Sequence, residues 1–219
     1  MIFDLHVHTT FSDGLLAPEQ VVDLALKKNI DGIAITDHDT ILGVEPAIAY
    51  SNKVGNIKVI PGIEFGCIFR NEEVNILGYF IDYKEKKIID ITKRLRRNRI
   101  ARGLEMIKKI NDLGMELTID EVKKLSNKDY IGRPHIARAL INRGYVTSIQ
   151  DAFNKWLNRG MPAYVERDTL TLVETINLIH ESNGIAVLAH PGLLIDKDII
   201  YYCIDNRIDG LEVIHSKHN

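Results

Sequence analysis

Residues 3–14 read FDLHVHTTFSDG, and this stretch puts two histidines on the segment that reads as the first β-strand of the chain. Side chains two positions apart in a strand lie on the same face, so His6 and His8 project together, and Asp13 follows five residues later. Two neighbouring imidazoles and a nearby carboxylate are the beginning of a divalent-metal site. A polar strand end would look the same, because a short H-x-H pair is a weak motif. The rest of the chain has to decide between the two interpretations.

The composition is that of a packed globular protein. Of the 219 residues, 45% are hydrophobic and 26% are charged, which suits one large domain or one domain with an insertion. No apolar run approaches the ~20 residues of a membrane helix, and the N-terminus lacks the cationic and apolar regions of a signal peptide. Cys67 and Cys203 lie far apart and are expected to be buried free thiols. We therefore expect a cytoplasmic protein without a disulfide framework or a membrane partner.

The net charge of −2 is unevenly distributed. Residues 84–109 carry eleven Lys and Arg against three Asp and Glu, which makes +8 locally and leaves −10 for the remaining residues. Such a stretch is usually the solvated face of a helix. It could also steer an anionic substrate towards a site, and the sequence leaves both interpretations open.

Apolar segments bounded by turn signals predict the strands of an α/β fold. In the first part of the chain we expect strands at 2–8, 32–38, 58–65 and 73–81. Amphipathic segments at 15–32 and 40–56 read as helices that connect the first three strands. Nearly continuous apolar strands joined by crossover helices predict a parallel sheet that is buried on both faces.

The pattern changes after residue 83 and becomes mostly helical. A long helix is expected at 88–114, and shorter helices follow at 118–126, 133–144 and 148–160. Alternation of helix and strand then resumes, with a helix at 170–184 and strands around 185–191 and 210–215. We therefore expect a barrel formed by residues 1–83 and 161–219, interrupted by a helical insertion or cap at 84–160.

The residues that could bind metal lie mostly at the ends of the expected strands. His38 ends the second strand, Glu64 the third and His190 the fifth, in addition to the two histidines of the first. Ligands bind at the C-terminal ends of the strands in parallel β/α folds. Histidine and glutamate side chains that several separate strands place at one edge of the sheet have no evident role in folding. Their convergence favours a metal site over a polar strand end.

Four motifs occur in the order DLHVHTTFSDG, IAITDHDT, IPGIEF and AVLAHPG. This order resembles the polymerase-and-histidinol-phosphatase (PHP) domain family, and in particular its small stand-alone phosphoesterases, which act on nucleotide phosphates or short RNA. The resemblance covers essentially the whole chain, including GRPHIARALI and NRGMPAYV. It implies a distorted seven-stranded β/α barrel with two or three divalent metal ions at its C-terminal mouth. Imidazole and carboxylate ligands suit Mn, Fe or Zn, and Mg is possible.

The resemblance also implies a role for each residue of the rim. Asp13, His38 and Glu64 match positions at the reacting centre and are the expected catalytic residues. The expected ligands are His6 and His8 for the first ion, Asp13 and His38 for the second and His190 for the third, with Glu64 bridging the first and the third.

Two features depart from the family pattern. Asn75 stands where similar phosphoesterases usually carry histidine, and an amide is a poorer ligand than imidazole for these metals, so we expect weak occupancy of the third site. The chain also ends without the family's final D-x-H motif and seventh strand. We therefore expect a truncated chain with weakened metal binding.

Further residues are candidates for substrate contacts. Arg133 and His135 open a helix in which Pro134 leaves the N-terminus free for an anion, so we expect phosphate contact there, with an arginine that caps a neighbouring loop as the alternative. Arg159 is a weaker candidate of the same kind. His215 and His218 are expected near the rim, within reach of the substrate. One of Asp37 and Asp39 is expected to orient an imidazole rather than to bind metal.

The function that this sequence predicts is metal-dependent hydrolysis of a phosphate ester. The substrate would be a nucleoside monophosphate or bisphosphate, or a short oligoribonucleotide, because the basic stretch favours an anionic substrate. No binding of stable duplex nucleic acid is expected. Two alternatives stay open: a histidinol-phosphate phosphatase, and a non-catalytic PHP domain that has lost metal ligands.

Overall fold

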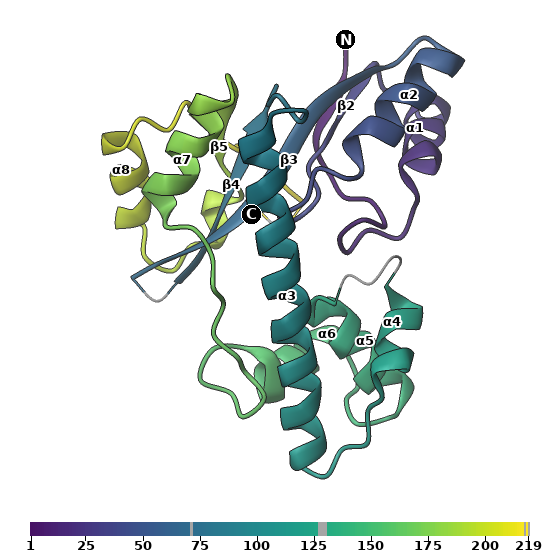
Figure 1. Ribbon diagram of the computed structural model, residues 1–219, viewed down its shortest axis with the longest axis vertical. Helices are drawn as coiled ribbons and strands as arrows, with labels where there is room; N and C mark the ends of the chain where they lie inside the picture. Colours follow the sequence, from purple (N-terminus) through teal and green to yellow (C-terminus); the bar gives the residue numbers. More distant parts are fainter. Residues whose placement is uncertain (71, 127–130, 217, 219) are drawn as a thin grey trace.

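A six-stranded sheet forms the body of the protein in the computed structural model, which describes residues 1–70, 72–126, 131–216 and 218 (Figure 1). The strands follow one another across the sheet in chain order, and the sheet curls into a half-barrel. The predicted α/β fold of the barrel type is therefore confirmed. The strands are β1 Phe3–Val7, β2 Gly32–Ile35, β3 Lys58–Phe69, β4 Glu72–Tyr79, β5 Ile185–Leu188 and β6 Gly210–Leu211.

The parallel pairing expected for the first three strands is confirmed and does not extend to the fourth. β4 runs antiparallel to both of its neighbours, β3 and β5, and β6 is again parallel to β5. Only two positions separate the end of β3 from the start of β4, whereas a parallel crossover needs about a dozen residues, so the chain turns back as a hairpin. β3 is longer than expected and reaches Phe69, because β4 pairs with its second half.

Four helices cover the sheet, two on each side of the view in Figure 1. They are α1 Pro18–Lys27, α2 Val44–Val54, α7 Leu172–Glu181 and α8 Asp198–Asp205. α1 begins at Pro18, whose missing N–H would have no partner at the first helical position in any case. It buries Val21, Val22 and Ala25 on one stripe. These helices and the strands share one hydrophobic core.

A helical segment lies below the sheet in Figure 1. Its helices are α3 Lys86–Asp112, α4 Ile119–Leu125, α5 Arg133–Asn142 and α6 Ile149–Ala152, followed by a π-helical turn at Phe153–Leu157. α3 joins the two parts of the protein: Ile88 and Leu95 belong to the core of the sheet, whereas Met106 and Ile110 belong to a second core formed with α4 to α6. The helical segment therefore has a core of its own and shares the helix α3 with the sheet.

Two further predictions concern the whole chain. None of the helices that the structure describes is long and apolar enough to cross a membrane. Cys67 and Cys203 are both buried free thiols, as expected. Burial raises the pKa of the Cys67 thiol to about 12, so this thiol stays protonated at neutral pH and is a poor nucleophile.

Candidate metal centre

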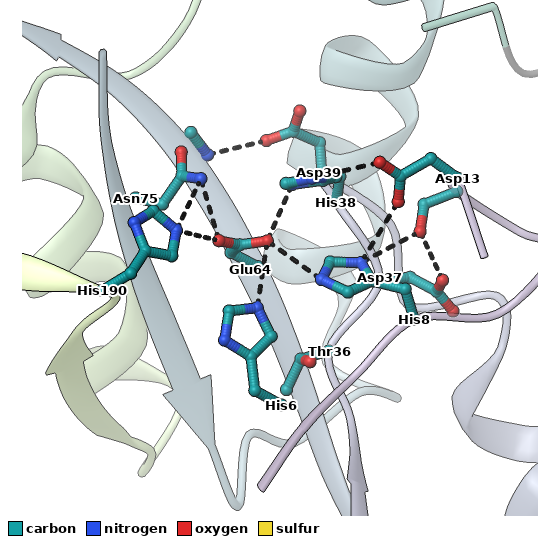
Figure 2. Close-up of polar contacts among 12 residues, drawn as sticks. His6, His8, Asp13, Thr36, Asp37, His38, Asp39, Glu64, Asn75 and His190 are labelled. Atoms are coloured by element: carbon teal, nitrogen blue, oxygen red, sulfur yellow. Dashed lines mark hydrogen bonds and ion pairs between the residues drawn. The ribbon is translucent and has the colours of Figure 1, made fainter. Parts of the chain in front are cut away.

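The buried carboxylate of Glu64 lies at the centre of a ring of histidines (Figure 2). His6 is on β1, His38 follows β2, and His190 follows β5. Glu64 itself lies in the middle of β3 and not at its end, which corrects the expectation from the sequence. The cause is the hairpin with β4, which pairs with residues 62–69 and so extends β3 to Phe69. The side chain of Glu64 is 1% exposed.

The distances around Glu64 are those of direct contact. Its Oε2 atom lies 3.4 Å from Nε2 of His6, 3.3 Å from Nε2 of His8 and 2.8 Å from Nδ1 of His38. Its Oε1 atom lies 3.2 Å from Nε2 of His190. The structure therefore places four predicted ligands, His6, His8, His38 and His190, around the fifth, Glu64.

The arrangement leaves polar atoms unsatisfied. Among the described residues, neither Glu64 Oε2 nor His38 Nδ1 has a hydrogen-bond partner, although both atoms are buried. An unpaired buried polar atom is costly. Lone pairs of imidazole and carboxylate that converge without hydrogen bonds form the donor set of a divalent cation. Three groups of ligand atoms among the described residues lie close enough to hold an ion, and two of them consist of predicted ligands only: His6, His8 and Glu64, and His8, Asp13 and His38.

Asp13 extends the cluster away from Glu64. Its two carboxylate oxygens lie 3.5 Å from Nδ1 of His8 and 3.8 Å from Nε2 of His38. Burial raises the pKa of Asp13, but His38 and His8 lower it by more, so the net shift is downward. Burial also raises the pKa of Glu64, and the surrounding histidines hold it well below the usual range. Both carboxylates are therefore ionised at neutral pH.

The field of these carboxylates acts on the imidazoles in turn. Burial lowers the pKa of His6, but the neighbouring carboxylates of Glu212 and Glu64 outweigh it and raise the pKa to about 10. Burial lowers the pKa of His38 as well, and the charges of Glu64 and Asp13 raise it overall. The site thus favours positive charge between its residues, which is what a cation site requires.

Asp37 and Asp39 both support the centre without touching an imidazole in the described contacts. Asp37 accepts hydrogen bonds from the Thr9 amide (2.7 Å), the Thr9 hydroxyl (2.6 Å) and the Ser12 hydroxyl. Ser12 Oγ lies 3.3 Å from Nδ1 of His8. Asp37 therefore orders the loop before Asp13 and reaches His8 only through Ser12.

Asp39 has a different set of partners. It accepts a hydrogen bond from the Gly66 amide at 3.1 Å and pairs with Arg99 of α3 and with Arg167. Burial raises the pKa of Asp39, and the two arginines lower it by more. Asp39 follows His38 directly, so these ion pairs tie the helical segment to the loop that carries a predicted ligand.

Glu212 belongs to the centre and was missed in the sequence. Its Oε1 atom lies 2.9 Å from Nδ1 of His6, and its Oε2 atom accepts a hydrogen bond from the His190 amide at 2.6 Å. The available signal was its place directly after the last strand, where the other candidates lie. Asn75 faces the cluster: its Nδ2 atom donates to Oε1 of Glu64 at 2.8 Å and lies 3.4 Å from Nε2 of His190.

A cavity of about 1320 Å³ opens over the cluster. Arg133 lines it, at the start of α5. The guanidinium of Arg133 pairs with Glu73 of β4 and lies 5.2 Å from the ring centre of Phe153. Arg102 lies 3.8 Å from the same Glu73, and its buried Nη2 atom has no hydrogen-bond partner among the described residues. A cationic side wall therefore adjoins the candidate ligands.

The other predicted substrate contacts are placed differently. His215 lines the cavity, with ring centres 5.8 Å from His6 and 5.3 Å from His190. The remaining three are not among the described lining residues. His135 is buried and accepts a hydrogen bond from the Gly132 amide (3.2 Å), Arg159 pairs with Glu166 (3.0 Å), and His218 accepts one from the Gly192 amide (3.3 Å). All four roles stay predictions.

The chain is similar to proteins of known activity. The family model of the PHP domain matches residues 4–158. The 5′-3′ exoribonuclease Rnm of Salmonella typhimurium is 36% identical over 220 residues, which cover 97% of this chain and 75% of that protein. The 3′,5′-nucleoside bisphosphate phosphatase of Chromobacterium violaceum is 33% identical over 223 residues, which cover 99% of this chain and 78% of that protein.

The fold comparison agrees with these matches. A solved structure from Bifidobacterium adolescentis, assigned as a metal-dependent phosphoesterase, superposes with a TM-score of 0.89 at 29% identity, over 99% of this chain and 78% of that one. Both named relatives act on phosphate esters. The comparisons and the geometry thus point to the same chemistry.

Proposed function

Because the chain belongs to the PHP domain family, we propose that it hydrolyses phosphorylated nucleotides or short RNA with divalent cations bound at the histidine cluster. Its class, phosphoester hydrolase, is that of its relatives and agrees with the sequence prediction. The observation that carries the proposal is the unpaired Oε2 of Glu64, buried among three imidazole nitrogens. A cation could coordinate all four atoms, and two of them, Glu64 Oε2 and His38 Nδ1, have no hydrogen-bond partner among the described residues.

The described residues fit two cations well. His6, His8 and Glu64 would hold one, and Asp13 and His38 the other, next to it. Glu64 and His190 offer a third, weaker position, because the amide of Asn75 lies there. Bound divalent ions would polarise the phosphoryl group and lower the pKa of water. Mn, Fe and Zn suit these ligands, and Mg is possible.

The protein's own residues have two tasks. The ionised carboxylates of Asp13 and Glu64, together with His38, remain our proposed catalytic residues, because they hold negative charge and lone pairs at the base of the cavity. Arg133 would contact the phosphate from the side wall, as arginine forks match phosphate oxygens. No covalent intermediate on sulfur is proposed, because the Cys67 thiol is buried and protonated.

The anionic nature of the substrate is supported by the placement of the basic stretch. Arg99 and Arg102 of α3 point inward, since their side chains are 11% and 7% exposed. This part of α3 is therefore not a solvated helix face. It brings positive charge to the junction between the sheet and the helical segment, beside the cavity that Arg133 lines.

A substrate panel tests the proposal. Phosphate release would be measured with added Mn²⁺ on a nucleoside 3′,5′-bisphosphate, a nucleoside monophosphate, a 5′-phosphorylated short RNA and histidinol phosphate. We expect turnover of at least one nucleotide substrate that is lost on chelation and in Glu64→Gln. Glu72→Gln is the control, because Glu72 accepts only backbone hydrogen bonds in the described contacts, from residues 195 and 196. Turnover of histidinol phosphate alone, or full activity of Glu64→Gln, would contradict the proposal.

A further inference from the structure

Glu212 connects two candidate ligands that come from distant parts of the chain. It follows β6, at one end of the strand order, whereas His6 is on β1 at the other end. The distance of 2.9 Å between Glu212 Oε1 and His6 Nδ1 therefore spans the open side of the half-barrel. The second carboxylate oxygen accepts the hydrogen bond from the His190 amide, at 2.6 Å. One carboxylate thus holds two histidines of the rim.

The contact with His6 decides which ring nitrogen faces the cluster. An ionised carboxylate only accepts hydrogen bonds, so Nδ1 of His6 is the donor to Glu212. In the neutral ring that binds a cation, the lone pair is then on Nε2, the nitrogen that lies 3.4 Å from Oε2 of Glu64. A carboxylate on the far nitrogen sets the tautomer and orientation of a metal-binding histidine and raises its basicity.

The contact with His190 acts on the backbone. His190 has φ of +33°, in the left-handed region that non-glycine residues rarely adopt. Its amide points at Glu212, and this conformation turns the ring so that Nε2 lies 3.2 Å from Oε1 of Glu64. Without the acceptor, the amide would lose its partner and the unusual conformation would lose support.

We propose that Glu212 is a positioning residue, which aligns His6 and the backbone of His190 so that both present Nε2 to the cations at Glu64. The inference rests on the proposed function. Glu212 could instead be a direct ligand, because it lies near His6 and His215 in a third group of candidate donor atoms. The contacts favour positioning, since one of its oxygens is engaged by the His6 ring and the other by the His190 amide.

The experiment is a calorimetric titration of the metal-free protein with Mn²⁺. Loss of a carboxylate behind a metal-binding histidine typically weakens metal binding by about 10- to 100-fold, so we expect Glu212→Ala to raise the Kd by that factor with an unchanged number of ions. Glu212→Gln should recover part of the loss, because its amide oxygen still accepts from an N–H group. Glu72→Gln is the matched control: Glu72, like Glu212, accepts hydrogen bonds from the backbone of the segment after β5, but in the described contacts it touches no histidine.

A second readout is the ¹⁵N spectrum of the His6 ring in the Zn²⁺-loaded protein. We expect a protonated Nδ1 in the unchanged chain and loss of that pattern in Glu212→Ala. If Glu212→Ala binds fewer ions and Glu212→Gln does not restore them, Glu212 is a metal ligand. If Glu212→Ala has an unchanged Kd and a lower melting temperature, the role of Glu212 is merely structural. Either result overturns the inference. If Glu212→Ala does not fold, an unchanged Kd in Glu212→Gln with an unchanged ¹⁵N pattern overturns it equally. A chain that binds no Mn²⁺ at all would refute the proposed function itself.

Discussion

His135 offers a sharp test, because its buried ring predicts a measurable dependence of stability on pH. The residue is 1% exposed, and its Nδ1 atom accepts the hydrogen bond from the Gly132 amide at the start of α5. Burial lowers the pKa of His135 from 6.5 to about 4. The substitution His135→Gln keeps an acceptor at the third position of the helix, where glutamine forms the same kind of cap, and removes the titrating group.

The sign and size follow from linkage. As pH falls below 6.5, the unfolded chain binds a proton at His135 and the folded protein does not, so stability falls until the pH reaches about 4. With these two pKa values, the free energy of unfolding drops by about 2 kcal/mol between pH 7.5 and pH 5 because of this residue alone. Above pH 6.5, the pKa of this histidine in the unfolded chain, the ring is neutral in both states and His135 no longer makes stability depend on pH.

Urea unfolding of the metal-free protein at several pH values measures this difference. We expect the stability of His135→Gln, relative to the unchanged chain, to rise by about 2 kcal/mol from pH 7.5 to pH 5. The other titrating groups cancel in this comparison, because they are present in both proteins. Parallel curves would refute the argument from burial. A large increase in KM for His135→Gln would support the substrate contact predicted from the sequence.

Three further predictions concern the centre and its surroundings. Asn75→His should add an imidazole beside Glu64 and raise the affinity for a third Mn²⁺, seen as an extra or tighter step in calorimetry; an unchanged isotherm would contradict the place of Asn75 in the cluster. Arg133→Ala should raise KM by about tenfold or more through a lost charged contact, whereas Arg143→Ala, which removes a partly exposed ion pair at the far end of α5, should leave KM unchanged. Asp39→Asn should destabilise the fold by about 3 kcal/mol, because it removes the buried carboxylate charge that two largely buried arginine side chains share; a loss below about 1 kcal/mol in urea unfolding would show that these ion pairs contribute little.

The histidines of the rim could be predicted because their signal is local. The period of two in a strand places His6 and His8 on one face, and the strand ends place His38 and His190 at one edge. These inferences need only the backbone geometry of a β/α fold. The metal-centre residues placed from single segments of sequence are therefore the ones that the structure brings together.

The contacts that the sequence did not reveal are all made between distant segments. Glu212 and His6 are 206 positions apart, and a single carboxylate after a short strand has no pattern that points to a particular partner. The ion pair of Arg133 with Glu73 likewise joins the helical segment to β4. The antiparallel direction of β4 is a different case: the short connection after β3 carried that information, since it excludes a crossover.

The same hairpin explains why the centre favours two cations over three. It brings Asn75 opposite Gly66, two positions along β3 from Glu64, so the amide and the carboxylate lie on one face of the sheet. The carboxylate dictates the orientation of the amide, because only the NH₂ group can face an acceptor. Oε1 of Glu64 is then engaged by a donor in the place where a third cation would need it. Binding there requires that the hydrogen bond break and the amide rotate, whereas Oε2 faces three imidazoles without a hydrogen-bond partner among the described residues. Cations should therefore occupy the side of Oε2 first.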